Sequence, residues 1–270
     1  MNGTTTVQLA EKTAKAVTGS VEEWTGFLQS AARLYKYSYP EQLLIYAQRP
    51  DATACASYEI WNQTMRRYVR RGARGIALPD GAGAVRYVFD VADTGARKSS
   101  REVKTWALDE NNREAVAHAL ETQYGSAAKL GIAGQLEEIA MQQSMDYWQW
   151  HQDELRGIVD GSFLEGYDEL NLEIAFRNTA AASVKYMLLS RCNLAREYQV
   201  EPEELAGVLE WNTSAASGAL GSAISELSEG VLRQIERTIR QYERSQIHDE
   251  RTGVYEERRV LDSRSDSSRT

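Results

Sequence analysis

The chain has 270 residues, 42% of them hydrophobic, and a formal net charge of −8. This length is enough for one large domain or two ordinary ones, while apolar runs such as Tyr186–Leu189 are far shorter than the roughly 20 residues that span a membrane. Residues 1–20 lack the apolar core of a secretory signal. The two cysteines, Cys55 and Cys192, cannot build a disulfide framework. We therefore expect a cytoplasmic protein without membrane contact, whose cysteines are buried free thiols.

The first part of the chain predicts helices joined by turns. Ser20 and Glu23 have the spacing of a capping box. The residues that follow form an apolar stripe at helical spacing: Trp24, Phe27, Leu28, Ala31 and Leu34. Pro40 suits the first turn of a second helix, and Ser57 suits the cap of a short third one.

Short strands are expected next, over Tyr68–Val69, 75–78, 85–91 and 103–108. In the third of these, Val85, Tyr87, Phe89 and Val91 alternate with Arg86, Val88 and Asp90. The glycine-rich stretch before it, GAGAV at 81–85, lacks the Gly-Lys-Ser/Thr end of a phosphate-binding loop and precedes a strand instead of a helix. It therefore indicates a hairpin turn.

From Asp109 onward the pattern is helical. The expected helices cover 109–124, 135–159, 172–191, a short stretch after Pro202, and 214–244. The last residues are polar and mixed in charge, and they predict disorder. The fold class is thus α+β: a unit with a small antiparallel sheet (1–125), a mostly helical region (126–246) and a disordered tail (247–270).

Catalytic motifs are missing from the sequence. His118, His151 and His248 do not form a His-Glu-x-x-His pattern and have no cysteine at zinc-binding spacing. Gly-x-Ser-x-Gly is absent, and acid pairs such as Glu137-Glu138 are adjacent, so they point apart on a helix. We expect a non-catalytic protein without a metal or other cofactor, although an enzyme of unrecognised type stays open.

Positive charge is concentrated in one segment of this acidic chain. Residues 66–104 hold ten basic and four acidic side chains, a net charge of +6, which leaves −14 for the remainder. Five of the ten are arginines within nine residues: Arg66, Arg67, Arg70, Arg71 and Arg74. Arginines neutralise phosphates and aromatic rings stack on bases, so Tyr68 between the arginine pairs, with Tyr58, Trp61 and Tyr87 near in sequence, would suit a single-strand site. The alternative is a solvated basic face with Trp61, Tyr87 and Phe89 in the core.

A family resemblance favours the first interpretation. The string YPEQLLIYAQRPDATACASYEIWNQTMRRYVRRGARGIALPD (Tyr39–Asp80), followed by RYVFDVADT, resembles the N-terminal domain of ArdC-type antirestriction proteins. It is most similar to the version found in large proteins of conjugative elements, described as Swi/Snf-like helicases, adenine-specific DNA methylases or LtrC-like proteins. The later stretches SVKYMLLSRCNL and EWNTSAASGALGSAISELSEGVLRQIERTI resemble the helical region that follows there.

The resemblance implies a domain of a mobile element that binds single-stranded DNA. The family's protease-like His-Glu-x-x-His, Walker motifs and methylase Asn/Asp-Pro-Pro-Tyr/Phe motif are absent, so none of those activities is implied. The positions that match the family string are Gln42, Leu43, Leu44, Trp61, Val69, Gly72, Gly75 and Ile76. Where this chain has Arg67 and Tyr68, family members often have glycine and tryptophan. We expect DNA contacts from Gln42, Arg66, Arg67, Tyr68, Arg70, Arg71, Arg74 and Arg86.

Two other functions stay open. The acidic helical half could dock a protein, including other parts of a conjugative element, and so serve as a scaffold. The chain could also inhibit a bacterial defence enzyme by mimicking DNA with its acidic surface. A DNA mimic needs carboxylates clustered on one face, whereas the acids here are spread along the helices and mixed with arginines.

Overall fold

The computed structural model describes residues 3–81, 83–194 and 200–266, with side chains described as far as residue 247. The helices are α1 (Gly3–Val17), α2 (Val21–Arg33), α3 (Tyr39–Gln48), α4 (Arg113–Tyr124), α5 (Gly131–Gly157), α6 (Glu169–Arg191), α7 (Pro202–Leu205) and α8 (Ser214–Asp266). The strands are β1 (Cys55–Ser57), β2 (Tyr68–Val69), β3 (Ile76–Pro79), β4 (Val85–Asp90) and β5 (Thr94–Gly95). Helices with a small antiparallel sheet confirm the predicted α+β class. No described helix is long and apolar enough to cross a membrane.

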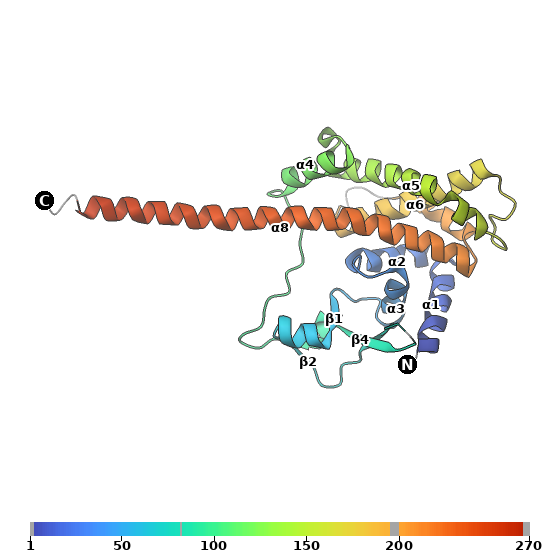
Figure 1. Ribbon diagram of the computed structural model, residues 1–270, viewed down its shortest axis with the longest axis horizontal. Coiled ribbons are helices and arrows are strands. Elements are labelled where there is room, and N and C mark those ends of the chain that lie inside the picture. The colour runs from blue at the N-terminus through green and yellow to red at the C-terminus, as the bar shows by residue number, and fades with distance from the viewer. Residues whose placement is uncertain (1–2, 82, 195–199, 267–270) are drawn as a thin grey trace.

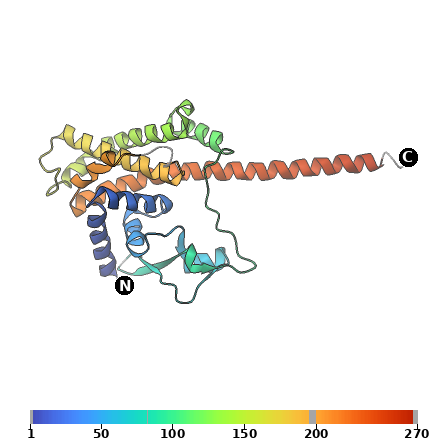
Figure 2. The ribbon, with the colours of Figure 1, turned by 180° about the vertical axis from the view of Figure 1, so that it is seen from behind.

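The elements are stacked in layers. Helices α1–α3 lie between the sheet and the helical half formed by α4–α6 and α8 (Figures 1 and 2). The C-terminal part of α8 extends away from this body, and its backbone continues as helix to Asp266. The side chains of 248–270 and the backbone of 267–270 are outside the described residues, and the disorder predicted for 247–270 stays a prediction.

Local capping signals position the N-terminal helices, at Ser20 and Pro40 as predicted and also at Ser38, which was not predicted. Ser20 Oγ accepts a hydrogen bond from the Glu23 backbone N–H at 3.2 Å, which caps α2. Glu41 accepts one from the Ser38 N–H at 3.2 Å at the start of α3, where Pro40 occupies the first turn. Helix α1 was not predicted, because its buried face consists largely of threonine and alanine and lacks a strong apolar period.

The three-stranded sheet has the order β1-β4-β3, with β3 and β4 joined by the predicted glycine-rich turn. Gly81 and Gly83 adopt φ values of +57° and +79° there, which glycine tolerates best. One face of this sheet packs on α3 through Ile76, Leu78 and Val88. In β4 the buried face is therefore not the one that carries most of the apolar residues. Val88 is buried against the helices, while Tyr87, from the more apolar face, is 45% exposed on the open side of the sheet.

The main hydrophobic core extends across the expected boundary between 1–125 and 126–246. It joins buried side chains of α1–α3 to those of α4–α6 and α8 in one cluster. Trp24 of α2 is fully buried in it, and its Nε1–H donates to Ser183 Oγ of α6 at 3.0 Å. The two expected units thus share a core, and a second, smaller cluster lies between α3 and the sheet.

The stretch 103–108 is not a strand, contrary to prediction, but part of an extended linker (96–112) from β5 to α4. Its backbone carbonyls accept hydrogen bonds from side chains instead of from the backbone N–H groups of a neighbouring strand. Arg240 donates to the Lys104 oxygen and Arg191 to the Trp106 oxygen, both at 3.0 Å. At its end, Asp109 caps a turn, and α4 begins only after Asn112.

Candidate nucleic-acid interface

The arginine segment (Arg66–Arg74) leaves the short helical turn Ile60–Thr64, forms β2 and ends beside the open face of the sheet. Strand β2 pairs with β5, so Tyr68 lies opposite Gly95. Arg66 adopts a φ of +54°, a left-handed conformation that is unfavourable for a residue with a side chain. The Ser100 hydroxyl donates to the Arg66 carbonyl at 2.7 Å and helps to hold this turn.

The charges of this segment are not paired with carboxylates in the described part of the chain. Across the described residues, none of its five arginines has a carboxylate oxygen within 4.0 Å. Arg67 and Arg70 donate to neutral acceptors, Thr94 Oγ1 at 2.8 Å and the Ala92 oxygen at 3.2 Å. The carboxylate below the segment, Asp93, is instead bound by Arg49 at 2.6 Å. The segment is therefore a surface of uncompensated positive charge.

The start of the linker adds further cations that were not predicted as site residues. Arg97, Lys98 and Arg101 are exposed. The Arg101 N–H donates to the Met65 oxygen at 2.9 Å, which holds the linker beside the arginine segment. The guanidinium of Arg97 lies over the Tyr68 ring, 5.6 Å from its centroid. The sequence alone did not group these residues with the arginine segment, because they follow it roughly thirty residues later in the chain.

Tyr68 is an exposed aromatic side chain that packs against the backbone of β5. It is 42% exposed and lies flat against Gly95, where an added Cβ would stand 2.3 Å from Tyr68 Cζ. A side chain at position 95 would thus have to displace the ring. Tyr58 and Tyr87 are also exposed, at 53% and 45%. Gly75, which directly follows Arg74, packs against Tyr87, so the arginine segment leads onto the aromatic open face of the sheet.

Two of the expected DNA contacts lie elsewhere. Gln42 is 2% exposed, and its side-chain amide donates to the Tyr37 oxygen at 2.9 Å, so it stabilises the start of α3 instead of facing a ligand. Arg86 projects to the helix-covered face of the sheet and forms an ion pair with Glu41 at 2.5 Å. Trp61 is 3% exposed with its Nε1–H bonded to the Phe89 oxygen, as its core interpretation predicted. The site that remains consists of Arg66, Arg67, Tyr68, Arg70, Arg71 and Arg74.

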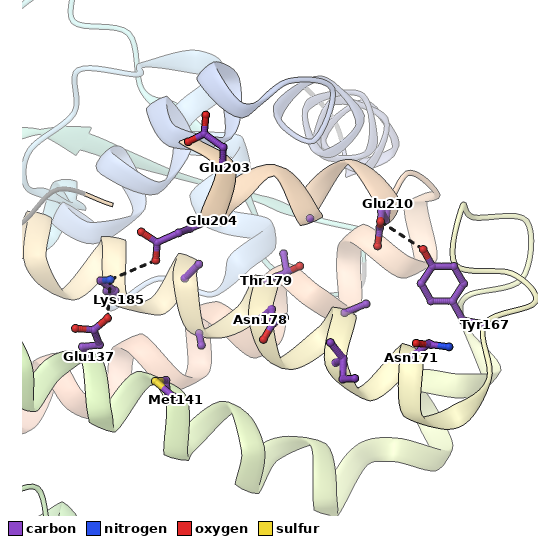
Figure 3. A pocket seen from close by; sticks show the side chains of 15 residues that line it. Glu137, Met141, Tyr167, Asn171, Asn178, Thr179, Lys185, Glu203, Glu204 and Glu210 are labelled. Atoms are coloured by element: carbon purple, nitrogen blue, oxygen red, sulfur yellow. Dashed lines mark hydrogen bonds and ion pairs between the residues drawn. The ribbon is translucent and has the colours of Figure 1, made fainter. Parts of the chain in front are cut away.

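A separate groove of about 600 Å³ lies on the helical half between α5, α6 and α7 (Figure 3). Lys185 closes one end, with Nζ at 2.8 Å from Glu137 Oε1 and 3.3 Å from Glu204 Oε2. The Tyr167 hydroxyl donates to Glu210 at 3.4 Å at the other end. A lysine and a tyrosine thus contact three of its carboxylates, Glu203 is a fourth, and Met141 and Ile174 contribute apolar surface.

The cysteines and acidic side chains do not form a reactive centre in the described part of the chain. No three His, Cys, Asp or Glu side chains there are placed to hold a metal ion. Burial raises the pKa of both Cys55 and Cys192 to about 12, so both stay as thiols at neutral pH.

Comparisons of the chain with protein-family models, with curated proteins and with solved structures found no match.

Proposed function

We propose that this protein binds single-stranded DNA through the arginine segment and Tyr68, without catalysing a reaction. The observation that carries the proposal is the juxtaposition of five arginines that have no carboxylate partner among the described residues with an exposed tyrosine. The arginines would hold phosphates, and Tyr68 would stack on a base. In a duplex the base faces are covered by neighbouring bases, so stacking favours a single strand.

The resemblance to ArdC-type domains supports the biological context. It supports a role in the cytoplasm of a bacterium that carries a conjugative element, where the protein would act in antirestriction or DNA transfer. Other proteins or domains of that element would be its partners. Family members often have a glycine where this chain has Arg67. Its loss is compatible with this role, because the left-handed backbone conformation that favours glycine lies at Arg66 and not at Arg67. Tyr68 replaces the family's tryptophan with another aromatic ring.

Fluorescence anisotropy with a labelled strand of about 20 nucleotides tests the proposal. If the five arginines each neutralise one phosphate, the logarithm of the affinity falls with the logarithm of salt with a slope of about −3.5. Affinity should therefore drop about 100-fold between roughly 50 and 200 mM salt. The unlabelled strand should compete better than the matching duplex. Absence of binding at low salt would contradict the proposal and favour the alternative, in which the arginines form a solvated surface without a ligand.

Truncation of Tyr68 to alanine should weaken single-strand binding, because a stacked base contributes about 1–3 kcal/mol. That range corresponds to a Kd about 5- to 150-fold higher. Tyr68→Phe keeps the ring and should bind as the unchanged protein does. Tyr167→Ala is the matched control, since Tyr167 is 43% exposed on the helical half. Equal affinities for all three variants would remove Tyr68 from the site.

A second candidate function, docking of a protein partner, is favoured by the groove in Figure 3. Its acidic lining of Glu137, Glu203, Glu204 and Glu210 around apolar side chains fits a basic amphipathic segment. This function would use the helical half and is compatible with DNA binding at the sheet. Loss of a co-purifying partner from a Glu203→Lys/Glu210→Lys variant, with DNA binding retained, would assign docking to this groove.

A further inference from the structure

A cleft of about 200 Å³ lies beneath the linker, between the α2–α3 loop, β1, the end of α6 and α8. The linker forms one wall through residues 103–106, and the body of the protein forms the others. Arg191 and Arg240 bond the linker carbonyls, and the Trp106 indole N–H donates to the Tyr35 hydroxyl at 3.0 Å. These bonds hold the linker over the cleft.

The side chains that line this cleft carry a large positive excess. Five of them are cations and one is a carboxylate: Arg33, Lys36, Lys104, Arg191, Arg240 and Glu236. The carboxylate is already shared, since Glu236 accepts hydrogen bonds from the Tyr35 hydroxyl at 2.5 Å and Arg240 at 3.3 Å and pairs with Lys36 at 2.6 Å. Among the described residues, Glu236 therefore forms ion pairs with Lys36 and Arg240 and none with the two remaining guanidinium groups.

Arg33 and Arg191 are the guanidinium groups of the cleft that no described carboxylate contacts directly, although Asp51 and Asp90 act on Arg33, and Glu236 acts on Arg191, from a longer distance. Arg33 donates to the carbonyls of Ala52 and Pro50, each at 3.0 Å. Arg191 lies 3.5 Å from the centre of the Trp106 ring and donates to the carbonyl of the same residue. Neither forms an ion pair within the described residues. Burial lowers the pKa of both guanidinium groups, so an anion in the cleft would stabilise their charged forms.

We propose that this cleft binds a phosphate group. Arginine donors in a partly desolvated setting favour phosphate, which accepts several hydrogen bonds at once. The phosphate could belong to a single strand or to a free phosphorylated small molecule. The first source rests on the proposed function, since Arg97, Lys98, Arg101 and Lys104 form a basic path along the linker from Tyr68 to the cleft. The second source is independent of it.

Calorimetric titration at constant ionic strength separates these cases, with pyrophosphate and a thymidine oligonucleotide of about 20 nucleotides as probes. The test variant is Lys36→Gln/Arg240→Gln, which removes two cations at the cleft mouth. The control variant Lys36→Arg/Arg240→Lys keeps both charges. We expect pyrophosphate to bind the unchanged protein at millimolar concentration or better, about tenfold more weakly to the glutamine variant, and nearly unchanged to the control.

The oligonucleotide then identifies the source. If the glutamine variant also weakens oligonucleotide binding, the cleft holds a phosphate of the strand. If the oligonucleotide does not bind at all while pyrophosphate binding stays sensitive to Lys36 and Arg240, the proposed function fails and the cleft remains a site for a small phosphorylated molecule. Absence of pyrophosphate binding to the unchanged protein, or equal binding to both variants, would overturn the proposal.

Discussion

Replacement of Arg70 and Arg71 by glutamate should weaken binding of a single strand about 100-fold at low salt. Both side chains are exposed and neither has a carboxylate partner in the described structure. The change removes two phosphate contacts and adds two charges that repel the strand. It should also make the dependence of affinity on salt shallower, by about one unit of slope for each lost contact. Anisotropy titrations at several salt concentrations measure both effects.

A matched variant separates this local effect from a change in overall charge. Arg233→Glu/Arg237→Glu alters the net charge by the same amount at two exposed arginines of α8. It should leave the affinity within about twofold, because these residues lie outside the arginine segment and exposed charges act over only about 8 Å at physiological salt. Equal losses in both double variants would mean that DNA responds to net charge and not to this surface.

Replacement of Trp24 by alanine should lower the free energy of unfolding by about 3–5 kcal/mol. The side chain is fully buried between α2 and α6, its ring lies 5.4 Å from the Phe27 ring at a tilt of 31°, and it donates to Ser183. Truncation leaves a cavity and an unpaired Ser183 hydroxyl in the core that the N-terminal helices share with the helical half. Urea unfolding followed by far-ultraviolet circular dichroism measures the loss.

Trp150 provides the control for this substitution, since it is 85% exposed on α5. Trp150→Ala should change the free energy of unfolding by less than about 0.5 kcal/mol. Both variants and the unchanged protein should unfold in one cooperative transition, because the core is continuous across residue 125. Two separate transitions in the unchanged protein would show that 1–125 and 126–246 are independent domains.

The predictions from sequence that succeeded depend on local signals. The helix cap at Ser20, Pro40 in the first turn of α3, the glycine turn before β4 and the two-residue strand Tyr68–Val69 each follow from a few neighbouring residues. The concentration of arginines is likewise a local property of the chain. These signals are visible without knowledge of which distant elements meet.

The predictions that failed depend on contacts between distant residues. Arg86 looks like part of the basic segment, but Glu41, 45 residues earlier, binds it on the covered face of the sheet. Gln42 was expected at a ligand-facing position, yet the turn before α3 buries it. The linker appears strand-like from its composition, whereas Arg240, 136 residues away from Lys104, takes the place of a neighbouring strand. The cleft under it has no signature in the sequence for the same reason.

Cross-linking tests the location of the bound strand most directly. A single strand of about 20 nucleotides that contains 5-iododeoxyuridine is irradiated in complex with the protein, and the modified peptides are mapped by mass spectrometry. We expect cross-links to Tyr68, with Tyr58 and Tyr87 as further acceptors. Trp150, a more exposed aromatic side chain on the helical half, is the internal control and should stay unmodified. Cross-links confined to Trp150 or to other residues of α5–α8 would contradict a DNA site on the arginine segment.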